Sequence, residues 1–308
     1  MIVSNPAFIS HQKTGMAASS MRSLSSDNSK YLQAFHLFLE RSTEHQCMQD
    51  FIEKQFPDII SGIGHGKTSL NVLGIGSGAG EIDLQLLSHI QRKYPGVRVN
   101  YDVVEPSSEQ ISSYKERVAK KSDLDHVNFT WHNKTSAEFE CEWNDRKEQK
   151  KYDFIHMIQM LYYVKDVSAT VKFFQKCMAP NGKLLIIIVS GSSGWDTLWK
   201  KHSHHLAVCD MNLLVTSWDM KQILDAQGAK YEHLNLPSFM DISECFIQGN
   251  RNGELLMDFL TEVCDFCKTA SPEMVAAILE DLKLPGCSQK RDGKILFNNN
   301  LAAIVVDP

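Results

Sequence analysis

Residues 70–83 read LNVLGIGSGAGEID, and this stretch decides the fold. A run of apolar residues leads into glycines at every second position from Gly74 to Gly80, and a helical pattern follows. Glycine lets a backbone approach a ligand closely, and the start of a helix supplies unpaired N–H groups. The stretch therefore predicts a strand, a loop and a helix that together hold a nucleotide.

The glycine spacing separates the classes of nucleotide-binding loop. No Gly-Lys-Ser or Gly-Lys-Thr follows, which excludes the ATP-binding loop. The dinucleotide pattern G-x-G-x-x-G fits poorly, because Glu81 stands where the third glycine would be. The G-x-G-x-G turn instead resembles that of class I S-adenosylmethionine-dependent methyltransferases. Those enzymes usually carry an acidic residue two positions before the first glycine, and this chain has Gly74 there.

The second expected strand ends in VVEPSSEQ, residues 103–110. Ligands of an open α/β sheet bind at the carboxyl ends of its strands, and Glu105 lies at that end. A carboxylate there can accept hydrogen bonds from both hydroxyls of a ribose. Because NAD enzymes use such an acid too, Glu105 predicts a ribose without naming the cofactor.

Strands and helices alternate through most of the chain, which predicts a doubly wound α/β fold with helices on both faces of a mostly parallel sheet. Extra helices at about 202–292 are interleaved with late strands, which predicts a small helical lid subdomain on a single core. We expect a flexible segment at 1–26 and one domain at 27–308, with further lid elements at about 27–60. The expected strands are 70–75, 97–105, 127–132, 152–158, 182–190, 230–235 and 294–306.

Composition narrows the class of protein. The chain has 308 residues, a net charge of −5 and eight scattered cysteines. The charge argues against nucleic acid as a partner, since that binding relies on clustered Lys and Arg. No apolar run reaches the roughly 18 to 20 residues of a membrane helix, and the first residues lack the pattern of a signal peptide. We therefore expect a cytoplasmic protein with reduced thiols that binds a small molecule and no membrane.

Two patterns invite a metal site, and we expect neither to hold a metal. Cys264 and Cys267 form a CxxC in an expected helix, without a second pair at a suitable spacing. His202, His204 and His205 fall in an expected loop without a partner motif. The sequence therefore predicts structural cysteines and solvated histidines.

The fourth expected strand ends in DFIHMIQMLYYVKD, residues 153–166. It resembles the methyltransferase segment that leaves the sheet beside the sulfonium methyl group. Enzymes that methylate amino groups of nucleic-acid bases usually carry Asn or Asp, two prolines and an aromatic residue there, and this chain has Gln159 and no proline. Gln159 offers both a donor and an acceptor, while Tyr162 and Tyr163 can form an apolar wall. The segment therefore favours a small acceptor over a nucleic-acid base.

Six separated motifs together resemble the histamine N-methyltransferase family, over roughly residues 16–306. The resemblance implies a monomeric cytosolic enzyme with a seven-stranded class I fold, which moves a methyl group from S-adenosylmethionine to an imidazole ring nitrogen. The motifs are STEHQCM (42–48), GAGEIDLQ (78–85), VVEPS (103–107), YDFIHMIQMLYYVKD (152–166), VSGSSGWD (189–196) and LFNN (296–299).

The resemblance also implies the residues of the site. Three positions match polar substrate contacts: Glu44, Gln159 and Asn299. By sequence pattern alone, Glu44 would be a solvated helix-end charge and Asn299 a turn or strand-edge residue. The positions that match cofactor contacts are Gly76, Glu105, Gln110, Ser136 and Ile158.

The family's aromatic substrate pocket is incomplete in this chain. Ser25 and Leu206 stand where the family has phenylalanine, Asn212 where it has cysteine, and Leu214 where it has tyrosine. A wider and more polar pocket favours a larger imidazole, so we expect carnosine as the acceptor and keep histamine as the alternative. Neutral drift with compensating repacking explains the same substitutions without a change of acceptor.

Two functions from other classes stay open. An NAD-type oxidoreductase requires the G-x-G-x-x-G spacing, which the loop lacks. A non-catalytic S-adenosylmethionine-binding protein would be marked by loss of Glu105, Gln159 or the loop glycines, and all are present. Imidazole methylation is therefore the leading hypothesis.

Overall fold

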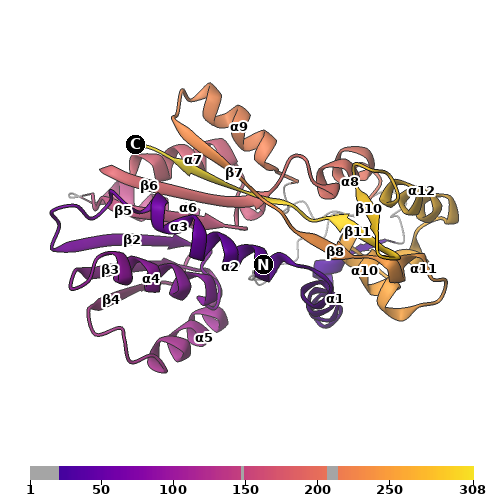
Figure 1. Ribbon diagram of the computed structural model, residues 1–308, viewed down its shortest axis with the longest axis horizontal. Coiled ribbons are helices and arrows are strands. Elements are labelled where there is room, and N and C mark those ends of the chain that lie inside the picture. Colours follow the sequence, from indigo (N-terminus) through magenta and orange to yellow (C-terminus); the bar gives the residue numbers. More distant parts are fainter. Residues whose placement is uncertain (1–20, 147–148, 207–213) are drawn as a thin grey trace.

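The computed structural model describes residues 21–146, 149–206 and 214–308. Within these residues, seven strands form a central sheet in the order β4–β3–β2–β5–β6–β12–β7 (Figure 1). Strands β4 to β6 in this order run parallel, and β12 runs antiparallel to both of its neighbours. The strands are β2 (Ser69–Ile75), β3 (Arg98–Val104), β4 (Val127–His132), β5 (Tyr152–Ile158), β6 (Met178–Val189), β7 (Tyr231–Leu236) and β12 (Leu301–Val306). The doubly wound, mostly parallel fold predicted from the sequence is confirmed.

Helices cover both faces of the sheet, because both faces of its central strands are apolar. One face packs against α2 (Glu44–Lys54), α3 (Phe56–Ile59), α4 (Glu81–Lys93) and α5 (Ser108–Ala119). The other face packs against α6 (Ser136–Asp145), α7 (Val167–Lys176) and α9 (Ser217–Ala226). Each face thus has its own hydrophobic core.

A second group of elements gathers beyond one end of the sheet (Figure 1). It contains a small antiparallel sheet in the order β10–β11–β8, which the sequence pattern did not predict. The helices of this group are α1 (Asn28–Arg41), α8 (Gly194–His202), α10 (Arg251–Thr261), α11 (Phe266–Thr269) and α12 (Pro272–Leu282). The small sheet is made of β8 (Phe239–Asp241), β10 (Ser288–Arg291) and β11 (Lys294–Asn298).

The prediction of a single strand at 294–306 is wrong. The structure has two strands there, and they belong to two different sheets. Its first half, β11, pairs with β8 and β10, whereas its second half, β12, pairs with β6 and β7. The chain changes sheets at Asn299 and Asn300. The main sheet and the second group of elements are therefore joined at this asparagine pair.

The sequence predicted a flexible segment at 1–26. Of these residues, 1–20 lie outside the described residues. Arg22–Ser23 form β1 and pair with β9 (Val263–Cys264), and Leu24 begins a 3-10 helix with its side chain fully buried. No helix in the described ranges is long and apolar enough to cross a membrane.

Candidate active site

The glycine loop after β2 adopts a backbone that other residues rarely tolerate. Gly76, Gly78 and Gly80 have φ angles of 67°, 55° and 76°. A Cβ atom on Gly76 would lie 2.7 Å from Cβ of Met160, and one on Gly80 would lie 2.3 Å from the ring of Tyr114. Only glycine fits both the left-handed backbone and the close packing. The loop therefore brings backbone N–H groups to the start of α4, as a nucleotide site requires.

Glu105 follows β3 and faces this loop. Its side chain is fully buried, its Oε2 accepts a hydrogen bond from the N–H of Gly78 at 2.9 Å, and its Oε1 accepts one from the N–H of Ser107 at 2.9 Å. A carboxylate has about four lone-pair sites, so a group of this type can hold backbone N–H groups and also accept from ribose hydroxyls. Glu105 thus fixes the loop and the turn after β3 in one arrangement.

The other predicted cofactor residues lie at the same edge of the sheet. Gln110 is in the first turn of α5, where its N–H donates to Ser107 Oγ at 3.3 Å. Ser136 is the first residue of α6, which begins after a capping box at Thr135. Ile158 is the last residue of β5. Because parallel strands end at one edge, loops far apart in the sequence surround one space, and these residues fit a nucleoside cofactor.

Glu44 and Asn299 form the centre of a buried polar group. Glu44 is 1% exposed and Asn299 is fully buried. The Nδ2 of Asn299 donates to Glu44 Oε2 at 3.0 Å and lies 3.1 Å from Ser238 Oγ. Asn299 Oδ1 accepts a hydrogen bond from Trp195 Nε1 at 2.7 Å. Buried polar groups are normally hydrogen-bonded, and these bonds fix the orientation of the Asn299 amide.

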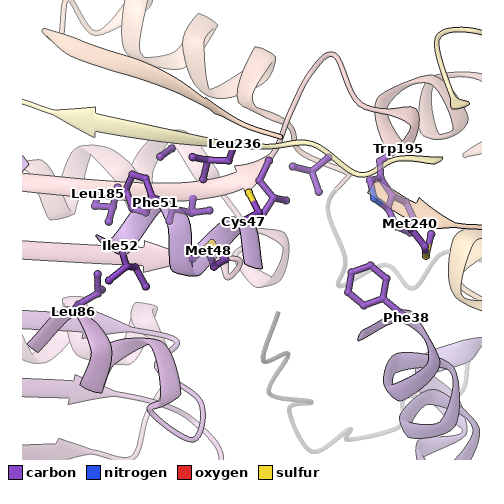
Figure 2. Packing of buried hydrophobic residues seen from close by; sticks show 14 of the residues in the cluster. Phe38, Cys47, Met48, Phe51, Ile52, Leu86, Leu185, Trp195, Leu236 and Met240 are labelled. Carbon is purple, nitrogen blue, oxygen red and sulfur yellow. The ribbon is translucent and has the colours of Figure 1, made fainter. Parts of the chain in front are cut away.

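Helix α2 positions Glu44 because its apolar face is anchored on the sheet. Figure 2 shows Cys47, Met48, Phe51 and Ile52 of this helix packed toward the core. All four side chains are buried, so the helix has little freedom to move. Glu44 is the first residue of this helix and therefore points from the core toward the turn at Asn299 and Asn300. The solvated helix-end charge suggested by sequence pattern alone is wrong.

Gln159 has an unusual backbone for its residue type. Its φ angle is 53°, and its N–H donates to the carbonyl of Ile187 at 2.9 Å. Its Oε1 accepts a hydrogen bond from the Tyr162 hydroxyl at 2.6 Å, and that hydroxyl accepts from the N–H of Val189 at 2.9 Å. Within the described residues, Nε2 of Gln159 is buried without a hydrogen-bond partner. The strained backbone and the unused donor are typical of a ligand-binding position.

Aromatic rings from three parts of the chain surround this polar group. Trp195 lies 5.7 Å from Trp199, 5.9 Å from Phe259 and 5.3 Å from Phe297, measured between ring centroids. Tyr162 lies 6.4 Å from Trp199. Burial raises the pKa of the Tyr162 hydroxyl, and the negative charge of Glu44 adds to the increase. The rings wall a site that a flat cationic or neutral heterocycle would fit.

Glu262 belongs to this region and was missed by sequence reasoning. It ends α10 with a φ angle of 54°, and its carbonyl accepts a hydrogen bond from the N–H of Leu24 at 2.8 Å. Burial raises the pKa of its carboxyl to about 7. Burial also raises the pKa values of Tyr31 and Tyr163, and the charge of Glu262 adds to both increases. The surface of Glu262 is partly accessible. No local pattern in DFLTEVC marks this residue, because its neighbours come from distant segments.

The expected solvated histidine loop needs correction at His202. This residue is the last of α8 and is 7% exposed. Its Nε2 lies 2.6 Å from Asp281 Oδ2, so α12 holds it by a hydrogen bond that the sequence does not show. Within the described residues, no group of three or more His, Cys, Asp or Glu side chains could hold a metal ion.

Three of the four departures in the aromatic pocket lie in the described residues. Ser25 lies next to Leu24, the residue whose N–H bonds to Glu262, and its Oγ lies 2.8 Å from Ser23 Oγ. Leu214 is half-buried, whereas Asn212 falls outside the described residues. Leu206 is partly buried against the first core. Ser25 thus follows a residue whose backbone is bonded to that of Glu262.

Comparisons with known proteins agree with this geometry. Residues 39–234 match the family model described as a methyltransferase domain. The chain is 58% identical over 289 residues to histamine N-methyltransferase of Xenopus tropicalis, covering 94% of this chain and 99% of that protein. It is 55% identical to the Bos taurus protein of the same name and 50% identical to that of Danio rerio, again over 94% of this chain. The cofactor of this fold is S-adenosylmethionine. The chain belongs to the histamine N-methyltransferase family of class I methyltransferases.

Proposed function

We propose that this protein transfers a methyl group from S-adenosylmethionine to an imidazole ring nitrogen of histamine. The single observation that carries the proposal is the buried Glu44–Asn299 pair beside the unused amide donor of Gln159. Relatives between 50% and 58% identical over nearly their full length are named for histamine. They favour histamine over carnosine, which the substitutions in the aromatic pocket had led us to prefer. The family assignment also leaves the oxidoreductase alternative without support.

The reaction requires alignment more than proton transfer. When bound, S-adenosylmethionine supplies an electrophilic methyl carbon on a sulfonium. The acceptor nitrogen must direct its lone pair at that carbon in line with the carbon–sulfur bond. Imidazole has a pKa near 6.5 and is mostly neutral at neutral pH, so no strong general base is needed. The protein's task is to hold one tautomer in one orientation, which can lower the barrier by several kcal/mol.

The side chains divide this task according to their chemistry. Glu44 accepts the N–H of the ring nitrogen that does not react, while Asn299 holds the carboxylate in place. Gln159 is assigned to the side of the site nearer the cofactor, where its Nε2 can donate to a polar group of a bound ligand while the lone pair of the reacting nitrogen stays free. Glu262 accepts the ammonium group of the substrate side chain, because it places a second carboxyl beside Tyr31 and Tyr163. Each assignment matches the donor or acceptor chemistry of the side chain.

Cofactor roles follow from position in the same way. We assign Glu105 to the ribose hydroxyls, and Gly76 and Ile158 to close backbone contacts. Gln110 and Ser136 lie at the starts of two helices and are assigned to the polar groups of the nucleoside. The elements at about 27–60 and 202–292 serve as the substrate-side lid of a domain at 27–308. We further propose that the enzyme acts as a cytoplasmic monomer without a nucleic-acid or membrane partner.

A methylation assay over a panel of imidazole compounds tests the proposal. The purified protein is incubated with labelled S-adenosylmethionine and histamine, carnosine, histidine or imidazole, and kcat/KM is measured for each. We expect histamine to have the highest value and the methyl group to be on a ring nitrogen. Efficient turnover of carnosine with histamine untouched would overturn the choice of acceptor. Absence of transfer to every imidazole, with cofactor still bound, would indicate a non-catalytic binding protein.

A further inference from the structure

The turn that carries Glu105 is held by one side chain from the neighbouring strand's loop. Asn133 follows β4, and its Nδ2 donates to the carbonyl of Glu105 at 3.2 Å and to the carbonyl of Pro106 at 2.8 Å. A carbonyl oxygen can only accept, so the nitrogen of the amide faces the turn and both of its hydrogens are committed. The partners of Asn133 therefore set the orientation of its amide.

The pairing of β3 with β4 brings Asn133 opposite this turn. The two strands are parallel, and their last paired residues are Val104 and His132. The N–H of Glu105 then donates to the carbonyl of His132 at 3.1 Å. Glu105 is fully buried, and a buried carbonyl that loses its donor destabilises the arrangement around it. Asn133 supplies a donor to this buried carbonyl.

The same turn determines where the carboxylate of Glu105 lies. Its two oxygens accept from the N–H groups of Ser107 and Gly78, each at 2.9 Å, so the side chain connects the turn to the glycine loop. On its other side, Asn133 precedes Ser136, the first residue of α6, by three positions. Asn133 thus joins the turn with Glu105 to the loop that leads to Ser136.

We propose that Asn133 is a positioning residue of the cofactor site, which holds the Glu105 carboxylate toward the ribose through the backbone of the turn. This inference rests on the proposed ribose role of Glu105. S-adenosylmethionine and its product S-adenosylhomocysteine share the ribose and differ at the sulfur. Asn133 should therefore affect the binding of both forms equally.

Binding calorimetry with both forms of the cofactor tests the proposal without any acceptor. Asn133→Ala removes both hydrogen bonds at an exposed position, so the variant should fold, and the Kd of each form should rise about 10-fold. Asn133→Asp keeps the shape of the side chain but cannot donate when ionised. It should raise the Kd of S-adenosylhomocysteine, which has no net charge, at least as much. Unchanged Kd values in either variant would overturn the proposal.

A double-mutant cycle separates positioning from a general structural effect. In the Glu105→Ala background, Asn133→Ala should raise the Kd by less than about 2-fold more, because the side chain that Asn133 positions is gone. The same increase in both backgrounds would show that Asn133 acts independently of Glu105, and would contradict the inference. Unchanged binding in Glu105→Ala alone would reject the ribose role and the inference with it. Weaker binding in Glu105→Ala but not in Asn133→Ala would reject only the positioning role.

Asn128→Ala is the matched control from the same strand. Asn128 is exposed near the amino end of β4, and its Nδ2 donates to Asn100 Oδ1 of β3 at 3.1 Å. The variant removes an amide hydrogen bond between the same two strands at the opposite edge of the sheet. Its Kd values should stay within about 2-fold of the wild type, because distant sites act independently. An increase equal to that of Asn133→Ala would indicate general loosening of β4 and would overturn the proposal.

Discussion

Asn299 Nδ2 donates a hydrogen bond to Glu44 Oε2 at 3.0 Å, although 255 residues separate the two in the chain. Glu44 begins the helix that is anchored on the central sheet, and Asn299 lies where the chain leaves the small sheet and enters β12. The bond therefore joins the first and last parts of the domain at the substrate side. It also holds the carboxylate that we assign to the acceptor ring.

This relationship predicts the effect of Glu44→Gln. A hydrogen bond to a charged group is worth about 1.5 to 3 kcal/mol, so kcat/KM for histamine should fall roughly 10- to 100-fold. The Kd of S-adenosylmethionine should stay within about 2-fold, because Glu44 lies outside the nucleotide-binding strands. Steady-state kinetics and calorimetry measure the two effects. Glu40→Gln, at an exposed position on α1, is the control, and equal losses of both quantities would assign Glu44 a structural role.

Glu105→Ala should weaken cofactor binding. The variant removes the proposed ribose acceptor and also the carboxylate that holds the N–H groups of Gly78 and Ser107. Loss of charge-assisted hydrogen bonds of this kind predicts a Kd for S-adenosylmethionine that is roughly 10- to 100-fold higher. Calorimetry on the folded variant gives the value, with exposed Glu109→Gln as a control from the following helix. Unchanged affinity would remove Glu105 from the cofactor site.

The raised pKa of Glu262 predicts how stability depends on pH. Its carboxyl has a pKa of about 7 in the folded protein and 4.5 as its ordinary value. Between these values the folded state keeps a proton that the unfolded state releases, so stability should fall as the pH rises from about 4.5 to 7. Glu262→Gln removes this loss of stability at high pH. The variant should therefore gain on the order of 2 kcal/mol over the wild type at pH 8, relative to their difference at pH 4.5.

Urea unfolding at pH 4.5, 6 and 8 measures this dependence for both proteins. Exposed Glu116→Gln serves as the control and should leave the wild-type pH profile unchanged. If the stability of the wild type and of Glu262→Gln changes in parallel with pH, Glu262 does not titrate in this range. Histamine should also protect the wild type more at pH 8 than the variant, because only an ionised carboxylate can pair with its ammonium group.

The parallel sheet and the glycine loop could be predicted because their signals are local. The run LNVLGIGSGAGEID contains the buried strand, the turn and the helix start within fourteen residues. The break at Asn299 could not be predicted, because KILFNNNLAAIVV reads as continuous strand while its halves pair with different sheets. A strand pattern reports which side chains are apolar and not which sheet they join.

The polar residues of the candidate site also divide into those that a local pattern predicts and those that depend on distant contacts. Glu105 follows from its place at the end of a strand, whereas Glu44 and Asn299 came only from family resemblance. Their pairing depends on a contact between opposite ends of the chain. Glu262 had neither a motif nor a resemblance to mark it, because its environment is made by Leu24, Tyr31 and Tyr163. Long-range packing, which no sequence window contains, creates these environments.

The acceptor preference should shift when aromatic side chains are restored. Ser25→Phe/Leu214→Tyr returns two aromatic rings at positions that the family resemblance assigns to the substrate pocket. Ser25 follows Leu24, whose N–H donates to the backbone carbonyl of Glu262, and Leu214 precedes the α9 cap at Thr216. The added rings improve contact with small histamine and occupy the space that the β-alanyl and carboxylate groups of carnosine need. Changes of pocket size typically alter preference by about 1 to 3 kcal/mol, so the ratio of kcat/KM for histamine over carnosine should rise roughly 10- to 200-fold.

The two single variants show whether both positions contribute, since contacts to one bound ring should be non-additive. Ser26→Phe is the matched control, because it places the same side chain at the exposed neighbouring position. It should leave the preference unchanged while it tests for a general effect of added bulk. A double variant with wild-type preference and an unchanged melting temperature would place both residues away from the acceptor. The substitutions would then be drift within an ordinary histamine-specific pocket, and carnosine would gain no advantage from them.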